Sequence, residues 1–175
     1  SEYGFNETNI NDILSCLDEN SGKQFFSKTH RLVKDRQYIF IDVIKNNTTN
    51  DFFLIDNCQS SLIHPLKMQI ELLRDLKFIN ISKDKNIAML DADLLKFPLI
   101  LRKWRQGDSF VPFGMRKEKK LSDYFTANKY SIIDKENQWI LCSEDKILWI
   151  VGERIDDRFR ISNKTKNILK IELEK

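Results

Sequence analysis

The sequence predicts an α+β fold built mostly from antiparallel strands. Apolar and polar residues alternate with a two-residue period in several stretches, which is typical of half-buried strands. Short polar turn segments separate neighbouring stretches, as they do in β-hairpins. Apolar residues at helical spacing occur in only a few short segments. Together these three observations favour a mostly antiparallel sheet structure with two to four helices.

The first 55 residues predict one helix followed by strands. A helix is expected over 6–19, capped by Asn6 or Thr8 and ended by Ser21-Gly22. Alternation from 24 to 44, interrupted by a turn at 34–36, predicts a hairpin, and 45–50 is a polar loop before a short strand over 52–55. The apolar stripe of the helix, which we expect in the core, consists of Ile10, Ile13, Leu14 and Leu17.

The rest of the chain predicts further strands and one more helix. Strands are expected over 66–73, 86–90, 98–105, 139–142, 147–151 and 167–173, with 143–146 as a hairpin turn. Leu121, Tyr124 and Phe125 stand at positions i, i+3 and i+4, which predicts a short helix over about 118–128 with these side chains in the core.

Composition sets limits on the class of protein. A length of 175 residues suits one domain, or one domain and a small module, and 41% hydrophobic residues can supply a core. No apolar run is long enough for a membrane span. Three cysteines without metal-ligand spacing predict reduced thiols in a cytoplasmic protein. Because the sequence begins with Ser1 and not with Met, we expect it to be a piece of a longer protein.

The segment 101–129 concentrates positive charge. It contains eight Lys or Arg residues against three Asp or Glu residues, whereas the whole chain has a net charge of only +3. Aromatic residues lie between the charges, so the segment is expected to be folded, with a basic surface suited to a partner that carries phosphates. Lys119 and Lys120 are predicted in the first turn of the 118–128 helix, where the dipole disfavours lysine and favours anions. Either a phosphate binds there, or these are two solvated lysines.

The same segment resembles the C-terminal domain of tRNA(Ile)-lysidine synthetase, also called synthase. The resemblance extends over about 97–161 and includes Leu141-Cys142, the run 147–152 and the run 154–159. Ser131 and Gln138 or Trp139 stand where that family often has proline. The motifs that match are Arg102, Gly107-Asp108, Pro112-Phe113-Gly114-Met115, Lys119-Lys120-Leu121, Asp123, Phe125 and Lys129.

The resemblance implies a layered β-sandwich with helices on one side and a division into three parts. These are 1–20, a helix from a preceding helical domain; 21–95, a β-rich linking module; and 96–175, the family's C-terminal domain. The family converts the wobble cytidine of tRNA(Ile) to lysidine with ATP, magnesium and lysine, through a glycine-rich loop. The five glycines of this chain include no adjacent pair, so that loop is absent. We expect this chain alone to be inactive, with no catalytic, cofactor-binding or metal-binding residues.

The implied role is tRNA recognition at the acceptor stem, in a bacterial, cytoplasmic ligase that modifies tRNA. Expected partners are tRNA(Ile), the N-terminal catalytic domain of the same polypeptide and possibly a second copy, without a membrane. The alternative is a structural or dimerisation domain without RNA contacts. A second basic stretch, 21–36, is either a further tRNA contact or a solvated strand edge. The expected tRNA-binding residues are Arg102, Arg105, Arg116, Lys119, Lys120 and Lys129.

Other polar and aromatic residues are expected to be structural. Asp156 and Asp157, flanked by arginines, are interpreted as ion-paired turn residues and not as a metal pair. Asp91 and Asp93 are interpreted as turn or capping groups. The three tryptophans, Trp104, Trp139 and Trp149, are expected in the core and not at a base-stacking surface.

Overall fold

The computed structural model describes residues 2–17, 22–44, 52–74 and 79–174. The chain forms two compact units: 1–49 with 129–135, and 50–128 with 136–175. These units are defined by packing. The division after residues 20 and 95 refers to domains of the family and stays a prediction. No helix in the described part of the chain is long and apolar enough to span a membrane.

The first unit contains a capped helix, α1 (Glu7–Ser15). Asn6 is the N-cap, because its side chain accepts a hydrogen bond from the backbone N–H of Asn9 at 2.8 Å, which confirms one of the two predicted caps. The helix ends at Ser15 with Cys16 as its C-cap, so the predicted end near residue 19 is wrong, and Ser21 lies outside the described residues. No residue of α1 is buried, and Leu14 is 58% exposed, so the prediction that the apolar stripe belongs to the core is wrong.

The first unit also contains a three-stranded antiparallel sheet, in the order β1 (Gln24–Phe26), β2 (His30–Asp35) and β3 (Tyr38–Val43). The predicted hairpin is confirmed as β2–β3, with its turn slightly later, at residues 36–37, but the single strand expected before that turn is divided at 27–29 into β1 and β2. All six residues of β3 are exposed. One short helix, three strands and the segment 129–135 offer too little surface to enclose every apolar side chain, which also explains the exposure of α1.

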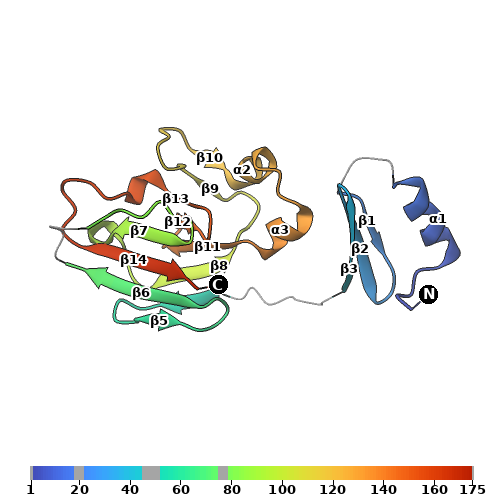
Figure 1. Cartoon of the computed structure of the whole chain (residues 1–175), viewed down its shortest axis with the longest axis horizontal. Helices are drawn as coiled ribbons and strands as arrows, with labels where there is room; N and C mark the ends of the chain where they lie inside the picture. The colour runs from blue at the N-terminus through green and yellow to red at the C-terminus, as the bar shows by residue number, and fades with distance from the viewer. Residues whose placement is uncertain (1, 18–21, 45–51, 75–78, 175) are drawn as a thin grey trace. The chain divides into compact units, whose positions relative to one another are not determined.

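The second unit is a two-sheet sandwich (Figure 1). A five-stranded sheet has the order β13-β12-β11-β8-β4, and a four-stranded sheet has the order β5-β6-β14-β7. Every pairing between the strands of the described residues is antiparallel, which confirms the predicted fold class. The strands are β4 (Phe52–Ile55), β5 (Ser61–Leu62), β6 (Met68–Leu73), β7 (Ile87–Asp91), β8 (Leu99–Lys103), β11 (Trp139–Ser143), β12 (Lys146–Ile150), β13 (Arg154–Ile155) and β14 (Ile168–Leu173).

The core lies between these two sheets. Leu99 and Leu101 of β8 are fully buried and alternate with residues that are only half-buried, as the predicted two-residue period requires. Across the interface the same core contains Ala88 and Leu90 of β7 and Ile171 of β14. Trp149 is 1% exposed and Trp139 packs against the core, whereas Trp104 is half-buried outside it.

A small hairpin and a helix pack beside the sandwich. The hairpin consists of β9 (Ser109–Phe110) and β10 (Lys119–Lys120), and the helix is α2 (Leu121–Ala127). Figure 1 shows these three elements together, above the strands β12 and β13 in that view. Leu121, Tyr124 and Phe125 of α2 are buried, which confirms the predicted apolar face.

Several short elements were not predicted. They are β5, β9, β13, the helix α3 (Ile132–Asn137) and the 3₁₀ turns η1 (Ala92–Leu94) and η2 (Asp157–Phe159). Most have two or three residues, too few for a period to be recognised in the sequence. Asp91 caps η1 by accepting from the N–H of Asp93, which confirms its interpretation as a capping residue.

Candidate nucleic-acid interface

The basic segment begins with an ion pair that shapes a turn. The guanidinium of Arg102 donates two parallel hydrogen bonds to the carboxylate of Asp108, both at 2.9 Å. The same carboxylate accepts from the backbone N–H of Arg105 at 2.7 Å, and Gly107 supplies the positive φ of 96° that the turn requires. The hydrogen bond with Asp108 raises the pKa of Arg102, although its partial burial opposes this. Arg102 therefore fixes the turn that presents the exposed Arg105.

The loop 111–118 between β9 and β10 is fastened by residues much later in the chain. The carboxylate of Asp156 is fully buried and accepts from the backbone N–H of Val111 at 2.9 Å. It also accepts three hydrogen bonds from Arg158, at distances of 2.7–2.9 Å. Asp157 accepts from the N–H of Gly114 at 2.9 Å and pairs with Arg160 at 3.4 Å. The interpretation of both aspartates as ion-paired turn residues is confirmed. Both carboxylates also accept backbone N–H groups of the loop 111–118 and so fix its conformation.

A cluster of aromatic rings packs α2 against the hairpin β9–β10. The rings of Trp104 and Phe125 lie edge to face with centroids 5.1 Å apart, and those of Phe110 and Tyr124 lie 5.2 Å apart. Burial raises the pKa of the Tyr124 phenol. The ammonium of Lys119 lies 5.8 Å from the centre of the Tyr124 ring, so this half-buried lysine follows the aromatic surface.

The predicted position of Lys119 and Lys120 in the first helical turn is wrong. Both residues form β10 and pair with Phe110 and Ser109, and Lys120 is the N-cap of α2, with an extended backbone (φ −62°, ψ 139°). The lysines precede the helix because pairing with a distant strand holds their backbone extended, a contact that local spacing does not reveal. The argument from the helix dipole does not apply to them.

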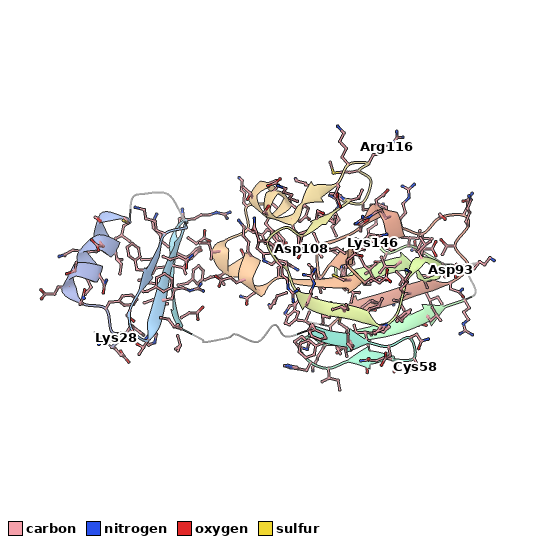
Figure 2. All side chains as sticks on the ribbon, turned by 180° about the vertical axis from the view of Figure 1, so that it is seen from behind. Lys28, Cys58, Asp93, Asp108, Arg116 and Lys146 are labelled. Carbon is pink, nitrogen blue, oxygen red and sulfur yellow. The ribbon has the colours of Figure 1, made fainter. Side chains whose placement is uncertain are left out.

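Four cations of the basic segment have no partner among the described residues, namely Arg105, Arg116, Lys117 and Lys120. Their side chains make no hydrogen bond or ion pair with any residue that the structure describes, and all four are exposed. Figure 2 shows Arg116 extending away from the ribbon, whereas Asp108 lies inside the unit. We call these four residues, with Lys119, the cationic hairpin surface. Its members are Arg105, Arg116, Lys117, Lys119 and Lys120.

Two of the three acidic residues in the segment 101–129 are engaged by other groups, and the third, Asp123, is exposed in the first turn of α2. Asp108 is already paired with Arg102. Glu118 accepts a hydrogen bond from the Ser109 hydroxyl at 2.9 Å and lies 3.9 Å from Arg158. The surface can therefore attract an anion with several charges.

Two other predicted contacts are placed elsewhere. Lys129 has a left-handed backbone (φ 57°) and belongs to the segment 129–135, which is part of the first unit. In the second basic stretch, Lys34 is only 6% exposed and Lys23 donates to the sulfur of Cys16 at 3.1 Å. Lys28 of the same stretch is exposed, so a tRNA contact there stays a prediction.

Sequence reasoning missed Lys117 and the anchoring role of Asp156. Lys117 was counted in the basic segment but was not distinguished from its neighbours, because charge alone does not show exposure.

Among the described residues, no group of three or more His, Cys, Asp or Glu side chains could hold a metal ion.

Comparison with known proteins identifies the family. The family model described as the TilS substrate binding domain matches residues 1–44, and the one described as the TilS substrate C-terminal domain matches residues 99–173. The tRNA(Ile)-lysidine synthase of Parabacteroides distasonis is 46% identical over 169 residues, which cover 96% of this chain and 38% of that protein. This chain belongs to the tRNA(Ile)-lysidine synthase family, as a C-terminal region.

Other synthases support the same assignment. The enzyme of Bacteroides thetaiotaomicron is 41% identical over 95% of this chain and 36% of its own length. That of Clostridium acetobutylicum is 29% identical over 100% of this chain and 39% of its own length. The chain thus spans less than two fifths of these synthases. A crystal structure of a TilS C-terminal domain has the same fold, with a TM-score of 0.59 at 19% identity over 71% of this chain and 97% of that domain.

Proposed function

We propose that this chain is the tRNA-recognition part of a tRNA(Ile)-lysidine synthase and that the cationic hairpin surface binds the phosphates of the tRNA acceptor stem. The observation that supports this proposal is the group of exposed cations without internal partners on a hairpin whose backbone is fixed. Because the backbone of the hairpin is already fixed, less conformational entropy is lost when RNA binds. A-form RNA keeps its base edges in a narrow major groove, so contacts to a stem depend on its shape and backbone.

The residues of the site have different roles in this proposal. Arg105, Arg116, Lys119 and Lys120, together with Lys117, contact phosphates. Arg102 is engaged by Asp108 and is a positioning residue, because removing it would release the turn that presents Arg105.

In the whole synthase, the catalytic domain would use ATP and magnesium to adenylate the wobble cytidine, and lysine would then displace AMP. The acceptor stem lies far from that base. Binding at the stem therefore contributes to kcat/KM by orienting the tRNA and not by touching the reacting group. The catalytic domain and tRNA(Ile) are the proposed partners, a second copy of the chain is a further one, and the bacterial cytoplasm is the proposed location.

The test is the salt dependence of tRNA binding by the Lys119→Ala/Lys120→Ala variant. Each lost phosphate contact should flatten the log–log slope by about 0.7–0.9, and affinity should fall similarly for all tRNAs. The control is Lys164→Ala/Lys166→Ala, which removes the same charge from two exposed lysines on the loop before β14. If both variants bind with the affinity and slope of the unchanged protein, the phosphate site is not on this hairpin, and a structural or dimerisation role becomes the better explanation.

A further inference from the structure

The tip of the loop 111–118 exposes two apolar side chains. Phe113 is 46% exposed and Met115 is 50% exposed, on either side of Gly114. Gly114 has a φ of 82°, a left-handed conformation that lets the chain turn between them. Arg116 and Lys117, both exposed, follow directly. The tip therefore combines an aromatic ring, a flexible thioether and two positive charges.

Hydrogen bonds hold this tip in place. The N–H of Phe113 donates to the carbonyl of Ile155 at 3.2 Å, and the N–H of Gly114 donates to the carboxylate of Asp157 at 2.9 Å. The N–H of Met115 donates to the carbonyl of Pro112 at 2.8 Å, and Pro112 is buried. Three successive backbone groups are thus fixed, so the Phe113 ring is presented to solvent from an ordered backbone.

Phe113 differs from the other aromatic residues of the basic segment. Trp104, Phe110, Tyr124 and Phe125 all pack against one another in edge-to-face pairs. Phe113 makes no ring–ring contact with any residue in the described ranges. Its ring is therefore available to a partner, and the neighbouring cations favour a partner with negative charge.

Resting on the function proposed above, we propose that Phe113 stacks on an unpaired base at the open end of the RNA stem whose phosphates contact the cationic hairpin surface. Every base has a face that can stack on an aromatic ring, and proteins that bind single strands combine such rings with a basic surface. Met115 extends the apolar surface beside the ring, because its unbranched thioether adapts to an aromatic partner. Arg116 and Lys117, which follow Met115 directly, contact the stem phosphates nearest to the unpaired base.

The phosphate contacts and the stacking on Phe113 can be distinguished by how each depends on salt. Phosphate contacts depend on salt, because they release counterions. Stacking on a ring releases none, so it should add affinity without changing the salt slope. The stem alone would engage the lysines, and only a stem that ends in unpaired nucleotides would also engage Phe113.

The experiment compares two RNA hairpins with the same stem, one blunt and one with four unpaired 3′ nucleotides that include 2-aminopurine. The unchanged chain should bind the overhanging RNA about 5- to 100-fold more tightly, and the fluorescence of the 2-aminopurine should fall on binding. Phe113→Ala should remove the preference and the fluorescence change, with an unaltered salt slope. Phe113→Trp should retain both. The control is Phe52→Ala, which removes an exposed ring from β4.

Three results would overturn the proposal. The first is equal affinity of the unchanged chain for blunt and overhanging RNA. The second is an equal loss of affinity for both RNAs in Phe113→Ala. The third is a concentration-dependent dimer that Phe113→Ala abolishes, which would make the tip a protein–protein contact. Failure of the phosphate site would appear separately, as an unchanged salt slope in Lys119→Ala/Lys120→Ala.

Discussion

Replacing Asp156 by asparagine should strongly destabilise the second unit. The carboxylate is fully buried, with Oδ1 accepting from the N–H and Nε of Arg158, and Oδ2 accepting from Val111 N–H and Arg158 Nη2. Asparagine keeps one oxygen and places an NH₂ group against two donors. It also removes the negative charge opposite the Arg158 guanidinium. The Arg158 side chain is 36% exposed, so water can solvate its charge, and the expected cost of about 2–4 kcal/mol in free energy of unfolding comes from the buried hydrogen bonds that are lost.

Urea unfolding followed by tryptophan fluorescence measures this loss. All three tryptophans, Trp104, Trp139 and Trp149, belong to the second unit, so the signal reports the unfolding of that unit alone. With a slope of about 2 kcal/mol per molar urea, the midpoint should fall by about 1–2 M.

The matched control is Asp157→Asn, the same change at the next residue. Asp157 is partly exposed and accepts one backbone N–H, so its replacement should cost only about 0.5–1.5 kcal/mol. If Asp156→Asn shifts the midpoint no more than Asp157→Asn, the buried carboxylate does not anchor the loop as described.

Two further changes test the packing of the second unit. Phe125→Ala should lower the free energy of unfolding by about 3–5 kcal/mol, because the ring is fully buried, and an unchanged urea midpoint would contradict this. Burial raises the pKa of the Cys142 thiol to about 11, from an ordinary value of 9.0, so in native protein at pH 8 iodoacetamide should modify the exposed Cys58 and not Cys142. Because the unfolded thiol ionises first, stability should fall by about 2 kcal/mol as pH rises from 9 to 11. Cys142→Ala should abolish that part of the decline; modification of native Cys142 as fast as Cys58 would refute its burial.

Local patterns predicted the elements whose side chains face one dominant core. The alternation in β6 is visible because Met68 and Ile70 are buried in the core while Gln69 and Glu71 are exposed. The same kind of alternation in β3 predicted a strand correctly but gave no information about burial, because both of its faces are exposed. The hydrophobic period of a sequence indicates helix or strand, whereas the burial of a side chain depends on which other elements pack against it.

The site was only partly accessible to sequence reasoning. The excess of positive charge identified the segment, and its residues carried the family resemblance. The distinction between Arg102, which is paired, and Arg105, which is exposed, depends on the geometry of a turn. The bond between Val111 and Asp156 joins residues 45 positions apart, and no local pattern specifies such a contact.

The place of β14 between β6 and β7 has a consequence for the order of events during synthesis. Leu173 opposes Met68 in β6, and Ile168 opposes Asp91 in β7, so neither of these earlier strands has its main partner until residues 168–173 emerge from the ribosome. At about 5–20 residues per second, roughly 5–20 s separate the synthesis of β6 from that of β14. The loop 111–118 likewise waits for Asp156. The nascent chain therefore displays its basic segment for seconds before Asp156 can fix the loop 111–118.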